Sequence, residues 1–125
     1  MRIAHIRERH APAGATWRLA AAAGAGDEWL DLEVARRRLV AREPGRAHNS
    51  SLFRQPISTL DDLFARGLRI EALGEILDGF APDARAHDPD DDAVLVAANL
   101  AFGPPILRPP TFRDFYAFEQ HVATM

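Results

Sequence analysis

The sequence contains no cysteine. This absence excludes disulfide bonds, thiolate nucleophiles and thiolate metal sites together. Any metal ion that this chain binds must therefore be held by carboxylate, imidazole or carbonyl groups.

Two further features are missing, an excess of basic charge and a long apolar run. The formal net charge is −3, whereas a nucleic-acid-binding domain carries a basic excess, so we expect no nucleic-acid partner. The longest small-apolar run, Leu19 to Gly26, is far shorter than the roughly 20 residues that a membrane-spanning helix needs. The first residues, MRIAHIRERH, are charged where a signal peptide has its apolar block. We therefore expect a cytoplasmic protein with no contact to a membrane.

What the sequence does contain is the composition of an ordinary globular domain. Its 125 residues, 47% hydrophobic and 26% charged, are enough for one domain with a modest core. Residues 3–6 alternate loosely, as in a short strand. The runs TWRLAAAAG and DEWLDLEVA, separated by a glycine-rich turn, predict a β-hairpin. We expect Trp17 and Trp29 to belong to the core.

Helical patterns fill the middle of the chain. A stripe of Leu32, Val34, Ala35, Leu39 and Val40 predicts a helix that ends at Pro44-Gly45. Residues 46–56 are predicted to form a loop. Ser58 or Thr59 is expected to cap a helix that Gly67 closes, and residues 68–80 are expected to form another helix.

The last third predicts an acidic loop over residues 82–92, a buried strand over Ala93–Ala98 and then a proline-rich connector. Its two Pro-Pro pairs favour extended structure. The predicted fold class is therefore α+β. Residues 1–108 form a small domain of short strands and two or three helices. Residues 109–125 finish the connector and form an amphipathic helix.

That final segment contains the residues best suited to metal binding or catalysis. On a helix, Phe118 and His121 both fall within roughly 40° of Asp114. Asp114 and His121 are about 10 Å apart along the axis, too far for a direct hydrogen bond but wide enough for a metal ion and a small substrate. The carboxylate could then ligate a metal while the imidazole acts as general base. In the simpler interpretation, Asp114 only caps the helix and His121 borders a packed face.

The same segment, RPPTFRDFYAFEQHV, resembles the entry into the catalytic domain of the fumarylacetoacetate hydrolase family. There a D-F-Y-x-x-x-Q-H type of string follows a proline-rich connector. The run APDARAHDPDDDAVLVAANLAFGPPILRPP also resembles the small N-terminal domain of bacterial members. The resemblance implies hydrolysis, decarboxylation or isomerisation of β-dicarbonyl compounds with a bound Mg²⁺ or Ca²⁺. It makes Asp114 a metal ligand, Tyr116 a substrate-contacting hydroxyl and His121 the base that activates water.

The sequence also departs from the family pattern. The remaining metal ligands, an E-x-E pair and a later aspartate, are expected downstream of the histidine, but only four residues follow His121. One carboxylate does not satisfy Mg²⁺ or Ca²⁺, which take six or more oxygen ligands. We expect this chain alone to be inactive. Completed by a catalytic domain packed on its last helix, it is expected to be a homodimeric hydrolase. The alternative is a small interaction module that binds a partner through the aromatic helix.

Overall fold

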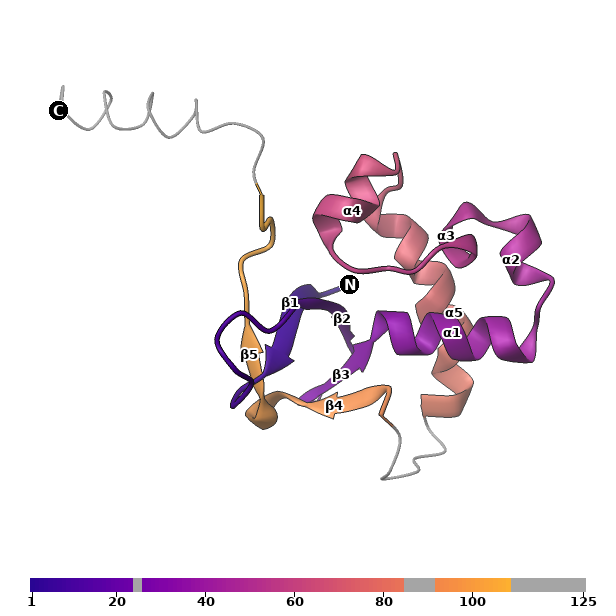
Figure 1. Ribbon diagram of the computed structural model, residues 1–125. Helices are drawn as coiled ribbons and strands as arrows, with labels where there is room; N and C mark the ends of the chain where they lie inside the picture. The colour runs from indigo at the N-terminus through magenta and orange to yellow at the C-terminus, as the bar shows by residue number, and fades with distance from the viewer. Residues whose placement is uncertain (24–25, 85–91, 109–125) are drawn as a thin grey trace, which may run out of the picture.

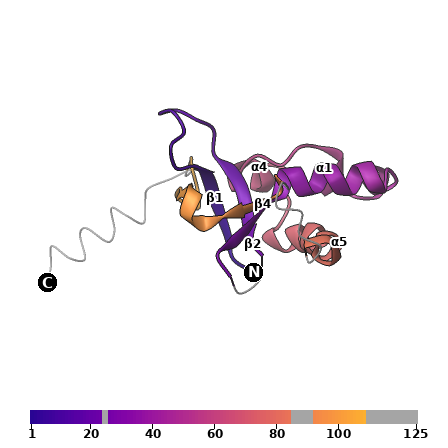
Figure 2. The same cartoon turned by 90° about the horizontal axis from the view of Figure 1, so that it is seen from below.

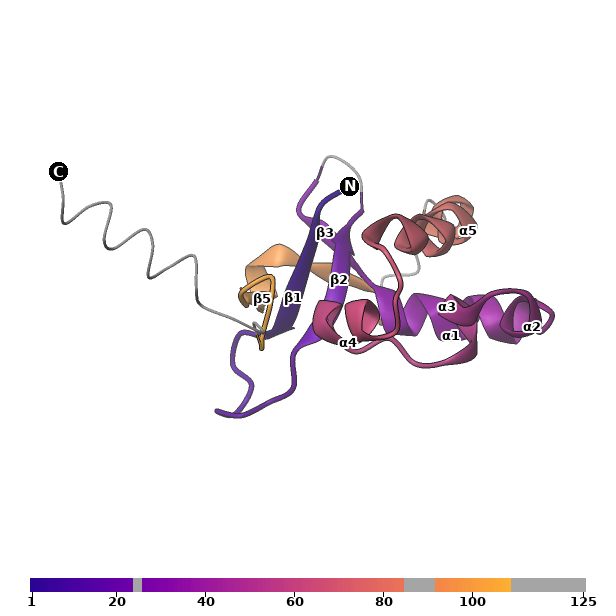
Figure 3. The same ribbon diagram turned by 90° about the horizontal axis from the view of Figure 1, so that it is seen from above.

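The computed structural model describes residues 1–23, 26–84 and 92–108. These residues form a five-stranded antiparallel sheet, with the α-helices gathered on one side of it (Figures 1, 2 and 3). The strands are β1 (Ile3–Glu8), β2 (Arg18–Ala22), β3 (Glu28–Asp31), β4 (Val94–Val96) and β5 (Leu100–Phe102). The α-helices are α1 (Leu32–Arg42), α2 (Arg46–Asn49), α3 (Ser51–Arg54), α4 (Leu60–Ala65) and α5 (Gly74–Ala84), and two 3₁₀ turns are η1 (Ile70–Leu73) and η2 (Ala97–Asn99).

The sheet has the strand order β4-β3-β2-β1-β5, and every neighbouring pair is antiparallel. The predicted hairpin is β2–β3, in which Ala21 lies opposite Leu30. One face of the sheet packs on the helices and contributes Leu19, Ala21 and Leu30 to the main core. That core also takes buried side chains from α1, α3, α4 and α5, namely Leu32, Ala35, Leu39, Leu52, Phe53, Leu60, Leu63, Ile76 and Phe80.

The sheet curls strongly, because its two edge strands follow each other in the chain. Only the three residues of η2 join the end of β4 to the start of β5. On the face away from the helices, the rings of Trp29 (β3) and Phe102 (β5) meet edge to face with centroids 5.2 Å apart. Inside this curve lies a second small core of Ile6, Ala20 and Leu100. The curl therefore also buries the centre of the sheet face that the helices do not cover.

Helix α1 forms where the sequence predicts it and begins directly after β3. Asp31 is its N-cap, and the Asp31 carboxylate accepts from the backbone N–H groups of Glu33 and Val34. Leu32, Ala35 and Leu39 face the core and are fully buried. Thr59 caps α4 by accepting from the Asp62 backbone N–H, also as predicted. Gly67 follows α4 with a positive φ of 75°, a conformation that glycine adopts without strain.

Several predictions of detail were wrong. Residues 46–56 are not a loop, because they contain the single-turn helices α2 and α3. Helix α5 continues to Ala84, into the range predicted as acidic loop. Ala93–Ala98 is not one buried strand but the short edge strand β4 followed by η2, and Val96 is 49% exposed. Trp17 and Trp29, both expected in the core, are half-buried, and Trp29 packs against a second, smaller core.

The predicted α+β class is confirmed, with more helices than the two or three expected. No helix in the described ranges is long and apolar enough to cross a bilayer. The division of the chain at residue 108 and the helix predicted over residues 109–125 concern the end of the chain that is not described.

Candidate functional site

The three residues predicted to carry chemistry, Asp114, Tyr116 and His121, all lie outside the described residues. The structure does describe the place from which their segment departs. We call this place the connector junction, and it consists of His5, Leu60, Asp61 and the connector residues 103–108. The junction brings the first strand, the start of α4 and the end of the described chain together.

His5 lies at the centre of the connector junction. It belongs to β1, opposite Leu19 on the helix-facing side of the sheet, and is fully buried. Its Nε2 atom accepts from the Leu60 backbone N–H at 3.0 Å, so the proton of the neutral ring is on Nδ1. Nδ1 then donates to the carbonyl oxygen of Pro104 at 2.8 Å. One imidazole therefore connects the sheet, α4 and the connector.

Asp61 holds the far end of the connector. Its Oδ1 accepts from the Leu107 backbone N–H at 2.9 Å, and its Oδ2 accepts from the Arg108 backbone N–H at 2.8 Å. These two hydrogen bonds favour the ionised carboxylate and lower the pKa of Asp61 below its ordinary value. The Asp61 carboxylate thus binds the backbone of Leu107 and Arg108, which precede the segment that contains Asp114.

The middle of the connector is fixed by packing and by one backbone contact. The Gly103 N–H donates to the His5 carbonyl at 2.9 Å, which extends the β1–β5 pairing by one step. Gly103 also lies so close to Trp17 that a Cβ atom there would stand 3.1 Å from three ring carbons. On Trp17 the Arg7 guanidinium lies 4.2 Å from the ring centre. Ile106 packs against the main core.

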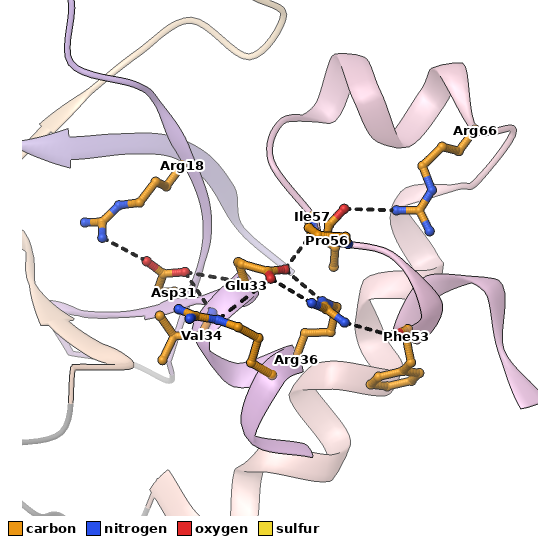
Figure 4. Close-up of polar contacts among 10 residues, drawn as sticks. Arg18, Asp31, Glu33, Val34, Arg36, Phe53, Pro56, Ile57 and Arg66 are labelled. Carbon is orange, nitrogen blue, oxygen red and sulfur yellow. Dashed lines mark hydrogen bonds and ion pairs between the residues drawn. The ribbon is translucent and has the colours of Figure 1, made fainter. Parts of the chain in front are cut away.

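A second polar cluster lies at the start of α1 (Figure 4). We call it the α1 junction, and it consists of Glu33, Arg36, Phe53 and Ile57. Glu33 and Arg36 form a two-pronged ion pair with contacts of 2.7 and 2.8 Å. Arg36 also donates to the Phe53 carbonyl at 2.8 Å, and Glu33 accepts from the Ile57 backbone N–H at 2.7 Å. This cluster ties α1 to the chain between α3 and α4.

Asp31, beside the α1 junction, places a carboxylate inside the curled sheet. Its side chain is 1% exposed, and its Oδ2 lies 3.2 Å from Nη1 of Arg18. That contact is an ion pair without hydrogen-bond alignment, since Oδ2 has no hydrogen-bond partner. Arg18 also contacts Glu8 on the neighbouring strand at 3.4 Å. The other Asp31 oxygen caps α1, so this buried charge is accounted for by a structural role.

Neither cluster has the features of a catalytic centre. The contacts above use the polar atoms of His5, Asp61, Glu33 and Arg36 for other parts of the same chain. Among residues 1–23, 26–84 and 92–108, no group of three or more His, Asp or Glu residues could hold a metal ion. What these residues do is fix neighbouring elements, and at the connector junction the fixed element leads to the predicted site.

Sequence reasoning missed the connector junction, although one signal was present. His5 stands in an alternating strand at a position that faces the core, and a buried imidazole needs partners for both nitrogens. Asp61 lies in the first turn of α4, where an acidic residue is favourable for the helix without any contact to a distant segment. Nothing local in the sequence indicates that it binds residues 107 and 108.

Comparison with known proteins identified no relative. No family model matches the chain, and neither the curated proteins nor the solved structures contain a match. Any function must therefore be argued from the resemblance in the last segment and from the way the domain holds the connector.

Proposed function

We propose that the chain is the N-terminal part of a metal-dependent hydrolase of the fumarylacetoacetate hydrolase type, which cleaves C–C bonds of β-diketo acids. In this proposal, residues 1–108 are an accessory domain. Asp114, Tyr116 and His121 belong to the catalytic part, and further polypeptide completes it. The proposal rests on the resemblance of the segment RPPTFRDFYAFEQHV, and the connector junction supports it by fixing the chain shortly before that chemistry. Asp114 follows Arg108 by six residues, and Arg108 is fixed to the domain by Asp61.

The proposed roles follow from the chemistry of the reaction. Cleavage beside a ketone needs a hydroxide equivalent near neutral pH, and an imidazole such as that of His121 can take the proton from water. Asp114 would hold a divalent cation as one oxygen ligand, and that cation would supply stabilisation of the negative charge on the departing group. Within this chain Asp114 offers one carboxylate for that cation, which falls short of the six or more oxygen ligands required. The chain alone is therefore expected to bind Mg²⁺ weakly and to turn over no substrate.

The test begins with the reading frame that encodes the chain. The proposal expects it to continue into an E-x-E motif about 60 to 80 residues past His121, a spacing that the resemblance implies. The protein expressed from this continued frame should cleave acylpyruvates only with Mg²⁺ or Ca²⁺ present. His121→Ala and Asp114→Asn should each abolish cleavage, whereas His10→Ala, at an exposed histidine, should leave it unchanged. Mg²⁺-dependent cleavage by the 125-residue chain alone, lost in His121→Ala, would contradict the incompleteness of the site.

A stand-alone interaction module remains the alternative, and one observation favours it. Phe64, one turn after Asp61 on α4, is 43% exposed, and Phe102, directly before Gly103, is 48% exposed. Exposed aromatic side chains beside the connector favour coverage by another protein surface. In this alternative Asp114 and His121 are structural. A stop codon directly after Met125, with partner binding unaffected by His121→Ala, would support the module and contradict the hydrolase.

A further inference from the structure

The connector is held to the domain by side chains from two distant elements. His5 and the Gly103 backbone hold its beginning, while Asp61 holds its end. Pro104 and Pro105, which lie between the two anchors, have no backbone N–H with which to pair. Attachment at the end of the connector therefore depends on the Asp61 carboxylate and on the packing of Ile106.

The two anchors differ in how deeply they are built into the fold. His5 is fully buried, and it also accepts from the Leu60 N–H, so its loss would disturb the start of α4. Asp61 lies at the surface end of the junction, where it is only partly buried. Apart from its place in the first turn of α4, its described contacts are with the Leu107 and Arg108 N–H groups. Removing its carboxylate should free the connector end and leave the core intact.

We infer that Asp61 is a latch on which the position of the connector end, Leu107 and Arg108, depends, and that the core of the domain folds without it. His5 holds the beginning of the connector. Because its ring also accepts from the Leu60 N–H of α4, this contact is part of the fold itself. This inference goes beyond the proposed function and holds for either candidate. In a hydrolase the latch fixes Arg108, six residues before Asp114 in the sequence, on the accessory domain. In an interaction module it fixes the same residue ahead of the aromatic segment.

The matched control is the neighbouring residue, Asp62. Both aspartates lie in the first turn of α4, so replacing either one with alanine removes the same favourable charge from the N-terminal end of that helix. The Asp62 side chain contacts Ser58 rather than the connector. A difference between Asp61→Ala and Asp62→Ala therefore isolates the connector contact from helix stability.

The absence of cysteine allows a direct measurement of the latch. Spin labels on Asp78→Cys, an exposed position of α5, and on Arg108→Cys report the distance from the domain to the connector end. We expect one narrow distance distribution in the otherwise native chain and in Asp62→Ala. In Asp61→Ala the distribution should become at least twofold broader. An unchanged distribution in Asp61→Ala would overturn the inference.

Amide hydrogen exchange provides a second readout that separates release from unfolding. In Asp61→Ala the amides of Leu107 and Arg108 should exchange at least tenfold faster, while the Gly103 amide, bound to His5, should keep its native rate. If Asp61→Ala fails to fold, Asp61→Asn serves instead, because its single side-chain oxygen retains one acceptor. Its Leu107 and Arg108 amides should then differ in exchange rate. Equal and native rates at all three amides in the folded variant would contradict a latch.

Discussion

The connector junction and the α1 junction are built from the same kind of hydrogen bond but differ in how deeply they are part of the fold. At each, a carboxylate in the first turn of a helix accepts from backbone N–H groups of a segment distant in sequence, Glu33 from Ile57 and Asp61 from Leu107 and Arg108. Glu33 is also neutralised by Arg36, a guanidinium that is only 8% exposed. The described hydrogen bonds of Asp61 come from backbone donors at the surface. Burial and an ion pair make the α1 junction part of the fold, whereas the connector junction is an attachment to it.

The strongest test of the difference between the two junctions is to remove Arg36. Arg36→Ala leaves the Phe53 carbonyl and most of the Glu33 carboxylate without their buried partner, and opens space beside α1. Breaking one side of a buried ion pair is strongly destabilising, so we expect a loss of about 3 kcal/mol in the free energy of unfolding, measured by urea denaturation. Arg37→Ala on the exposed side of α1 is the control and should cost less than about 0.5 kcal/mol. A loss in Arg36→Ala no larger than in this control would remove the distinction between the junctions.

His5 combines features of both junctions, since it is buried like Arg36 of the α1 junction but belongs to the connector junction. His5→Ala leaves the Leu60 N–H without an acceptor in the core, while the exposed Pro104 carbonyl can turn to water. An unsatisfied buried donor costs about 1–3 kcal/mol, and we expect a loss near 2 kcal/mol in unfolding free energy. Amide exchange should accelerate at both Leu60 and Gly103. His10→Ala provides the control, and acceleration confined to Gly103 would show that His5 does not couple the connector to α4.

Some elements of this fold could be predicted from the sequence, and others could not. Strand β1, the β2–β3 hairpin and helix α1 follow from local periodicity, and Thr59 as the cap of α4 follows from local hydrogen bonding. The cap of α1, Asp31, was not predicted. Helices α2 and α3 were missed because each has only four residues and neither has a side-chain cap. Such single turns are unstable alone and depend on tertiary contacts. For α3 the contacts are the burial of Leu52 and Phe53 and the bond from Arg36 to the Phe53 carbonyl. Helix α2 has no buried residue, and its Arg46 guanidinium lies over the Phe53 ring of α3 at 5.5 Å.

The connector junction was out of reach for a related reason. His5 and Pro104 are 99 residues apart in the chain, and Asp61 and Leu107 are 46 apart. No local pattern encodes such a pairing, because it arises only when the curl of the sheet brings β5 and its continuation past β1 to α4. The apolar run at Ala93–Ala98 was misread for the same reason, since the strand order that makes β4 an edge strand is set by its pairing with the distant β3. The roles of Asp114, Tyr116 and His121 remain predictions.

The smallest expected effect concerns the protonation of Asp61. Hydrogen bonds from the Leu107 and Arg108 N–H groups lower its folded-state pKa below the ordinary value of 3.8. A lowered pKa means that the latch is fully present above about pH 3.8 and is lost only as the pH falls through the lower, folded-state value. The amide resonances of Leu107 and Arg108 should therefore titrate together, with a midpoint below 3.8, and this step should disappear in Asp61→Asn. The Gly103 amide reports whether the domain is still folded at that pH. A midpoint above 3.8 with Gly103 unchanged would mean that the connector contacts do not favour the charged carboxylate, and Asp61 would not be the group that holds the exit of the chain.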